Sequence, residues 1–369
     1  MPISDFDRLQ LRASLQLARG SFGLTEPNPR VGCVIGHADG RICGVGATQA
    51  AGSHHAEVMA LREAATAGWA TTGATAWVSL EPCAHFGRTP PCCDALIAAG
   101  ITRCVVALLD PHPLVAGQGL ARMRAAGLVV DVLATDDETA REAREVNIGF
   151  FSRVERGRPW VRVKVAASAD GRTALPDGTS KWITSEAARA DGHCWRKRAS
   201  AVLTGIGTVL ADDPRLDVRA VPTASQPLRI VLDTHLRLPL KAALLATPGT
   251  ALVVAAPGST AAAVALRHAG AEVWDDWPSG RMPALQELMA QLAIRGINEI
   301  HLEAGATLIG AFHAAGLIDE WLIYFAPTLL GPGRSMVDCT VLPSLGDARR
   351  GRWAGMEAVG DDLRLRLWV

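Results

Sequence analysis

The first half of the chain carries a histidine, a glutamate and two cysteines at spacings that suit a zinc site. An H-x-E pattern joins His55 to Glu57, a Pro-Cys pair follows at Cys83, and a further cysteine stands at Cys92. One imidazole and two thiolates leave the fourth tetrahedral position of Zn²⁺ open to water, whose pKa the metal lowers toward neutrality. Glu57, two residues after the histidine, would stay off the metal and carry a proton between the water and the substrate. We therefore expect His55, Cys83 and Cys92 to bind one Zn²⁺ ion and Glu57 to be catalytic.

Other residues of the same segment offer alternative ligands. His85 could close the metal site as a fourth ligand, and Cys93 could compete with its neighbour Cys92. Neither is favoured, because a closed structural site would leave Glu57 without a task. His54 is a rival imidazole, but only His55 keeps the H-x-E spacing.

Strands that alternate with helices are predicted to position these residues. Such an order is typical of an open α/β sheet, in which ligands lie at the carboxyl ends of the strands. Cys83 follows one of these strands directly. Apolar periodicity predicts helices at 5–18, 55–67, 120–126 and after Cys92, strands at 31–36, 43–47, 74–80, 103–109 and 129–133, and a hairpin turn at 39–40.

A charged segment with glycine, residues 152–159, is predicted to link this unit to a second α/β unit. Two glycine-containing loops of that unit, 204–208 and 303–307, follow strands and suggest a phosphate-bearing cofactor, although tight turns that need small residues are an equal alternative. Leu210 breaks the G-x-G-x-x-G pattern, so a Rossmann fold is disfavoured. The predicted strands are 160–166, 201–204, 228–232, 251–255, 299–303 and 320–325, and the predicted helices are 186–199, 261–268, 283–295 and 307–315.

Composition narrows the class of protein. A chain of 369 residues exceeds the usual size of one hydrophobic core. Lys and Arg together number 37, as do Asp and Glu, so there is no basic excess of the kind that binds nucleic acid. No stretch of about 18 apolar residues predicts a membrane span, and scattered cysteines suit a reducing compartment. We expect a cytoplasmic enzyme that acts on a small molecule.

Several strings resemble the bifunctional deaminase-reductase family of riboflavin biosynthesis. Residues 82–92, P-C-A-H-F-G-R-T-P-P-C, and residues 27–32 resemble its deaminase half, while 164–184, 205–216 and 303–305 are similar in order and spacing to its reductase half. The resemblance implies a cytidine-deaminase-like α/β/α domain at 1–150 and a dihydrofolate-reductase-like α/β domain at 159–369. It also implies zinc and NADPH as cofactors, and it suggests a homodimer.

The implied chemistry has two steps on one phosphoribosyl pyrimidine. Hydrolytic deamination of 2,5-diamino-6-(5-phosphoribosylamino)pyrimidin-4(3H)-one gives 5-amino-6-(5-phosphoribosylamino)uracil, whose ribosyl group NADPH then reduces to ribityl. By this resemblance Asn28 would hold the pyrimidine. NADPH would contact Ala166, Trp182, Thr208, Asp212 and Gly305, and the reductase substrate would contact Lys164, Ser180, Arg196, Leu216, Arg219 and Glu303. Arg196 and Arg219 suit that role because guanidinium groups bind phosphate through paired donors.

The chain departs from the family pattern at four positions, His54, His112, Ala169 and Ala304. A Cβ at Ala304 would crowd a cofactor phosphate if that residue needed a positive φ, which would weaken the reductase. Two alternatives therefore stay open. One is a nucleic-acid deaminase of the tRNA type with an unrelated C-terminal domain, and the other is a family member with one inactive domain.

Overall fold

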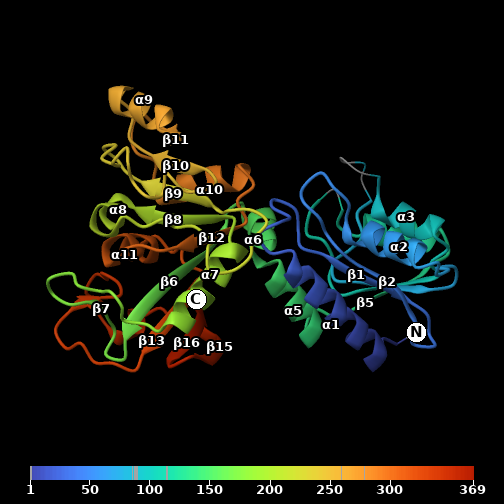
Figure 1. Cartoon of the computed structure of the whole chain (residues 1–369). Helices are drawn as coiled ribbons and strands as arrows, with labels where there is room; N and C mark the ends of the chain where they lie inside the picture. Colours follow the sequence, from blue (N-terminus) through green and yellow to red (C-terminus); the bar gives the residue numbers. More distant parts are fainter. Residues whose placement is uncertain (1, 85, 87–89, 114, 259, 278) are drawn as a thin grey trace. The chain divides into compact units, whose positions relative to one another are not determined.

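The computed structural model describes residues 2–369 except positions 85, 87–89, 114, 259 and 278. The chain divides into two compact units, Met1–Gly157 and Arg158–Val369 (Figure 1). Among the described residues, no helix combines the length and the apolar character needed to cross a membrane.

The first unit is a five-stranded sheet with helices on both faces, in the strand order β2-β1-β3-β4-β5. β1 pairs antiparallel with β2 and β3, whereas β3, β4 and β5 run parallel. Its elements are α1 (Asp5–Gly20), β1 (Gly32–Gly36), β2 (Ile42–Ala47), α2 (Ala56–Thr66), β3 (Thr75–Val78), α3 (Cys92–Ala98), β4 (Arg103–Val106), α4 (Gln118–Ala125), β5 (Val129–Val132), α5 (Glu138–Val146) and α6 (Ile148–Arg156).

Glycines let two helices lie directly against opposite faces of this sheet. A Cβ on Gly32 would stand 1.9 Å from the Ser14 carbonyl oxygen of α1, and a Cβ on Gly46 would stand 2.2 Å from the Ala56 carbonyl oxygen of α2. Neighbouring residues of a strand point to opposite faces, and Gly46 pairs with Cys33, the neighbour of Gly32. α1 and α2 therefore cover different faces, and the start of α2 is held tightly against β2.

Each helix and strand predicted for the first half is present, within a few residues at its ends. The predicted linker is wrong in its first part, because residues 152–156 belong to α6. Gly157 ends that helix with a φ of 65°, a left-handed conformation that favours glycine. The apolar face of α6, which includes Phe150 and Phe151, packs into the core of the first unit.

The second unit is built on a nine-stranded sheet in the order β11-β10-β9-β8-β12-β6-β13-β16-β15, beside a two-stranded β14-β7 pair. The strands from β11 to β13 run parallel, and β16 and β15 extend the sheet antiparallel. Its elements are β6 (Trp160–Ser168), β7 (Arg172–Ala174), α7 (Glu186–Arg198), β8 (Ala201–Gly205), α8 (Ile206–Asp212), β9 (Leu228–Leu232), β10 (Ala251–Val254), α9 (Thr260–His268), β11 (Ala271–Trp274), α10 (Leu285–Ile294), β12 (Glu299–Leu302), α11 (Ala306–Ala314), β13 (Glu320–Ala326), β14 (Arg334–Ser335), the 3₁₀ turn Leu345–Asp347, β15 (Arg352–Val359) and β16 (Asp362–Trp368).

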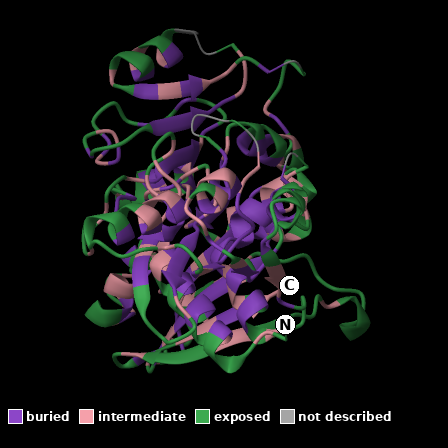
Figure 2. Ribbon diagram, turned by 90° about the vertical axis from the view of Figure 1, so that its right-hand side faces the viewer, coloured by how far each residue is buried: buried purple, intermediate pink, exposed green. Residues whose placement is uncertain are grey.

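The two faces of the large sheet differ in character. Val163, Ile300 and Leu302 pack with residues of α10 and α11 in one apolar core. On the opposite face, Arg162 and Glu299 form a fully buried ion pair that Arg198 of α7 joins. Figure 2 shows the buried residues concentrated along the strands and on the inner sides of the helices. The face under α7 therefore carries buried charged side chains, whereas the other face is apolar.

Candidate active sites

The three predicted metal ligands meet at one point of the first unit. His55 immediately precedes α2, Cys83 follows β3, and Cys92 is the first residue of α3. His55 Nδ1 lies 3.6 Å from Cys83 Sγ and 3.3 Å from Cys92 Sγ, and the three ligand atoms all lie within 4.8 Å of one another. Two sulfurs and one imidazole nitrogen at this separation are a donor set that suits Zn²⁺.

The electrostatics of the cysteines also suit a cation. The hydrogen bond from the Cys92 thiol, with the nearby His55, lowers the pKa of Cys83 to about 4. The adjacent Cys83 sulfur raises the pKa of Cys92 in turn, because a thiolate at Cys83 opposes the loss of a proton from the neighbouring Cys92 thiol. A bound cation would allow both thiols to ionise, because a thiol that coordinates a metal is deprotonated.

The rival ligands do not join this group. The Cys93 thiol points to Asp94, with Sγ 3.7 Å from Oδ1, and in the described part of the chain neither Cys93 nor His54 belongs to the metal-ligand cluster. His85, the predicted alternative fourth ligand, lies outside the described residues.

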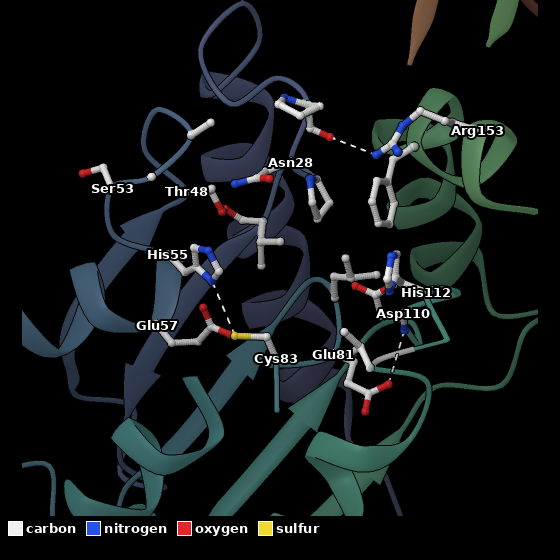
Figure 3. Close-up of a pocket in the computed structure, with 18 residues that line it drawn as sticks. Asn28, Thr48, Ser53, His55, Glu57, Glu81, Cys83, Asp110, His112 and Arg153 are labelled. Carbon is white, nitrogen blue, oxygen red and sulfur yellow. Dashed lines mark hydrogen bonds between the residues drawn. The ribbon is translucent and has the colours of Figure 1, made fainter. Parts of the chain in front are cut away.

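Glu57 stands in the first turn of α2, where it is 3% exposed. Burial, followed by the charge of the nearby Cys83 thiolate, raises the pKa of Glu57 to about 7 in the metal-free chain. Its carboxyl group lines the same cavity as His55 and Cys83 (Figure 3). A carboxyl group whose pKa is near neutrality can both accept and donate a proton.

The cavity has a volume of about 400 Å³, within the range of small-molecule sites. Figure 3 shows His55 and Glu57 toward one end of it and Arg153, from α6, toward the other, with Asn28 between them in this view. Asn28, which the resemblance assigns to the pyrimidine, lines the cavity, and its backbone N–H donates to the Thr25 carbonyl oxygen at 2.9 Å.

Arg153 and Glu81 are among the cavity residues that were not identified from the sequence. Glu81 is 4% exposed, and its carboxylate accepts N–H groups from the backbone of residues 110–120, including Gly117 at 2.9 Å and Gly119 at 3.1 Å. Glu81 therefore fixes the loop that carries His112 into the cavity wall. Its position directly before Pro82-Cys83 was the available signal, whereas Arg153 lies far from the ligand motifs in the sequence, in the segment predicted as a linker, and gave none.

In the second unit, three predicted substrate residues lie together on the face under α7. Arg196 forms a two-point ion pair with Glu303, with Nε–Oε1 at 2.5 Å and Nη2–Oε2 at 2.9 Å. Burial would raise the pKa of Glu303, but the charge of Arg196 holds it well below its usual value. Burial lowers the pKa of the Lys164 ammonium, and the charge of Glu303 opposes that shift.

Arg196 and Arg219 both engage acidic partners in the folded chain. Arg196 Nη1 donates to the Asp217 carbonyl oxygen at 3.0 Å, and Arg219 Nη1 lies 2.7 Å from Asp217 Oδ1. Any phosphate bound by these guanidinium groups would therefore share them with Glu303 and Asp217. Leu216, also predicted to touch substrate, is only 2% exposed.

The predicted cofactor loops lie at the carboxyl ends of neighbouring parallel strands, β8 and β12. Gly205 precedes α8 and Gly305 precedes α11, and a Cβ on Gly207 or Gly305 would meet no atom within 4 Å. Open space beside backbone N–H groups at a helix start fits a phosphate-bearing cofactor such as NADPH. Among the non-glycine residues of the described chain, only Asp213, Leu216 and Leu236 have positive φ angles. Ala304 therefore does not have the positive φ that would bring its Cβ against a cofactor phosphate.

The remaining predicted cofactor residues lie on several elements. Ala166 is on β6 beside β13, and Thr208 and Asp212 are on α8. Trp182 is exposed, and the Arg189 guanidinium lies 4.6 Å from its ring centre. Ser180 precedes Trp182 in the segment before α7 and is half-buried.

Comparison with known proteins covers both units. Residues 5–108 match the family described as the cytidine and deoxycytidylate deaminase zinc-binding region, and residues 159–365 match the RibD C-terminal domain. The riboflavin biosynthesis protein RibD of Aquifex aeolicus is 40% identical over 361 residues, covering 98% of each chain, and that of Escherichia coli is 42% identical over 98% of this chain and 99% of its own.

Solved structures agree over the same length. RibD of Acinetobacter baumannii superposes with a TM-score of 0.87 at 41% identity, covering 98% of each chain. A diaminohydroxyphosphoribosylaminopyrimidine deaminase/5-amino-6-(5-phosphoribosylamino)uracil reductase of Thermotoga maritima gives a TM-score of 0.85 at 28% identity, again over 98% of each chain. These matches confirm the predicted fold class and cofactors, zinc and NADPH, and leave the nucleic-acid deaminase alternative without support. With both halves matched in one order along nearly its whole length, the chain belongs to the RibD family of deaminase-reductases of riboflavin biosynthesis.

Proposed function

We propose that residues 1–150 form the deaminase domain and that His55, Cys83 and Cys92 hold its zinc ion, with Glu57 as the catalytic acid and base. The observation that carries this proposal is the convergence of the three ligand atoms within 4.8 Å of one another beside a buried glutamate. When bound, zinc would supply a Lewis acid that activates water for attack on the ring carbon bearing the 2-amino group.

The protein residues have separate tasks in this deamination. Asn28 would orient the pyrimidine ring in the cavity. Glu57 would take one proton from the attacking water and pass it to the ring nitrogen. It would then carry the second proton of that water to the departing amino group, so that one water is consumed and one ammonia is released. Its carboxyl group is buried in the wall of the same cavity as His55 and Cys83, where both proton transfers would take place.

We propose that residues 159–369 form the reductase domain, which acts on the deaminated product. When bound, NADPH would supply a hydride to the open-chain form of the ribosyl group, and the protein aligns donor and acceptor. The assignment of Ala166, Trp182, Thr208, Asp212 and Gly305 to NADPH, and of Lys164, Ser180, Arg196, Leu216, Arg219 and Glu303 to substrate, follows the family resemblance. For Lys164, Arg196 and Glu303 the close cluster under α7 supports it.

The function is tested by incubating the chain with the diaminopyrimidine ribotide, with and without NADPH, and measuring product masses. Without NADPH, we expect an amino group to be replaced by a carbonyl oxygen, with release of ammonia. With NADPH, we expect a further gain of two hydrogens. A mass change at only one step would indicate a family member with one inactive domain, and no change at either step would refute the proposal.

A homodimer and a cytoplasmic location also belong to this proposal. All eight cysteines are unpaired, as suits a reducing compartment. The homodimer rests on the family resemblance, and a mass measurement in solution by light scattering tests it.

A further inference from the structure

The deaminase cavity has a cationic end opposite its metal-binding end. Arg153 lines the cavity together with His55, Glu57 and Asn28. Figure 3 shows its guanidinium group on the side of the cavity away from His55 and Glu57. Because the reacting pyrimidine ring must lie at the metal, its phosphoribosylamino group must extend toward another part of the cavity wall.

We infer that Arg153 recognises the phosphate of the phosphoribosyl substrate and makes the deaminase specific for the ribotide over its dephosphorylated riboside. This inference rests on the proposed function. It assigns a specificity residue to the first reaction, in a part of the chain that neither the zinc motif nor the reductase pattern includes.

The structure holds Arg153 in place from two sides. Its Nη2 donates to the Pro27 carbonyl oxygen at 3.3 Å, and its guanidinium carbon lies 5.6 Å from the centre of the Phe150 ring. Phe150 is itself buried and lines the cavity. The guanidinium is thus oriented before substrate arrives, which reduces the entropy cost of binding an anion.

A second set of contacts ties the helix of Arg153 to the loop of Asn28. Asn147, the residue before α6, accepts from the Arg30 backbone N–H at 2.8 Å and donates to the Arg30 carbonyl oxygen at 2.8 Å. Arg30 in turn donates from Nη1 to the Val146 carbonyl oxygen at 3.0 Å. The ring-binding residue Asn28 and the cation Arg153 are therefore kept in a fixed relation, as a site for a ring joined to an anion requires.

The charges around the cavity decide which end would take the anion. Glu57, Glu81 and Asp110 contribute carboxyl groups to the wall, whereas Arg153 is the one arginine or lysine among the described residues that line it. Glu26, whose charge also acts on Arg153, is paired with Arg30 at 2.6 Å. A phosphate monoester carries nearly two negative charges at neutral pH. With the ring held at the metal end, Coulomb forces favour a place for the phosphate beside Arg153 over one beside Glu81 or Asp110.

The test compares two substrates, the diaminopyrimidine ribotide and its riboside, in the full-length zinc-loaded enzyme. Ammonia release is measured for the wild type and for Arg153→Met, Arg153→Lys and Arg156→Met. Arg156 lies on the same helix outside the cavity lining, so Arg156→Met is the matched control. For Arg153→Met we expect kcat/KM with the ribotide to fall roughly 10- to 100-fold, the usual effect of losing charge-assisted hydrogen bonds. With the riboside, kcat/KM should stay unchanged, and Arg153→Lys should be intermediate with the ribotide.

The use of two substrates separates phosphate recognition from a structural role. If Arg153 only supports the loop of Pro27 and Asn28, Arg153→Met would impair both substrates equally, and the inference would be wrong. Unchanged kinetics with both substrates would also overturn it. Zinc content and NADPH oxidation with the deaminated ribotide report folding of each variant. If the wild type releases ammonia from neither compound, the proposed function itself fails, and the inference fails with it.

Discussion

At the scale of single residues, Glu57 is the group whose task can be tested separately from metal binding. Because Glu57 is placed as a proton carrier and not as a ligand, Glu57→Gln should retain about one zinc ion per chain. Ammonia release should fall by about 10²- to 10⁴-fold, the usual contribution of general acid-base catalysis. Metal analysis and an ammonia assay on the same preparation check both expectations. Intact ammonia release from zinc-loaded Glu57→Gln would contradict the proton-transfer role.

Adjacent cysteines provide a matched pair for testing the ligand set. Cys92 Sγ lies 3.3 Å from His55 Nδ1, whereas the Cys93 thiol points to Asp94. We expect Cys92→Ser to lose most of its zinc, because a neutral hydroxyl is a far weaker ligand than a thiolate, and we expect Cys93→Ser to retain it. Zinc content after dialysis measures this difference. If Cys93→Ser lost zinc and Cys92→Ser retained it, Cys93 and not Cys92 would be the metal ligand.

The residue motifs could be predicted because zinc chemistry restricts both residue type and spacing. His55 and Glu57 share the start of one helix, so their relation is local and visible in the sequence. The pairing of Arg196 with Glu303 was not predicted, because it joins residues 107 positions apart in the chain. The contact between Arg153 and Pro27 spans 126 positions and was missed for the same reason.

At the scale of elements, prediction succeeded where apolar periodicity was strong and failed where it was weak. β1 and β10 consist of buried residues and were identified, as was the amphipathic helix α1. β15 was not predicted, because most of its residues are exposed or half-buried and show no apolar alternation. The charged second half of α6, from residue 152 on, was read as the start of a linker, although the helix runs from Ile148 to Arg156.

The packing of α2 on β2 gives a test at this scale. A Cβ on Gly46 would lie 2.2 Å from the Ala56 carbonyl oxygen and 2.5 Å from the Ala60 backbone nitrogen, so Gly46→Ala must displace the start of α2. Since His55 and Glu57 stand there, we expect weaker zinc binding and loss of ammonia release. The free energy of unfolding should fall by about 1–3 kcal/mol, the usual cost of overpacking.

Gly20 provides the control for this substitution. It is the last residue of α1, and an added Cβ would meet no atom within 4 Å. Gly20→Ala should therefore keep zinc and activity, and its stability should be equal or higher by up to about 1 kcal/mol. Zinc titration, ammonia assays and denaturant unfolding compare the two variants. Equal behaviour of Gly46→Ala and Gly20→Ala would show that the helix-to-strand contact does not position the site.

At the scale of the whole molecule, the two units have separate apolar cores. The apolar core of the first unit contains residues between Leu11 and Phe151, and those of the second unit contain residues between Val161 and Tyr324. The division into two α/β units could be predicted from the order of strands and helices and from chain length. That the second unit uses NADPH required the family resemblance, because short glycine loops alone do not distinguish a phosphate site from a turn.

This division predicts that zinc removal affects only one reaction. The proposed metal ligands, His55, Cys83 and Cys92, all belong to the first unit. Dialysis against a chelator should therefore abolish ammonia release from the diaminopyrimidine ribotide. Oxidation of NADPH with the deaminated ribotide, followed by absorbance, should continue at the rate of the untreated enzyme, and added Zn²⁺ should restore only the first reaction. If chelation stopped both reactions and Zn²⁺ restored both, the reductase would depend on the metal centre, and the two activities could not be assigned to independent units.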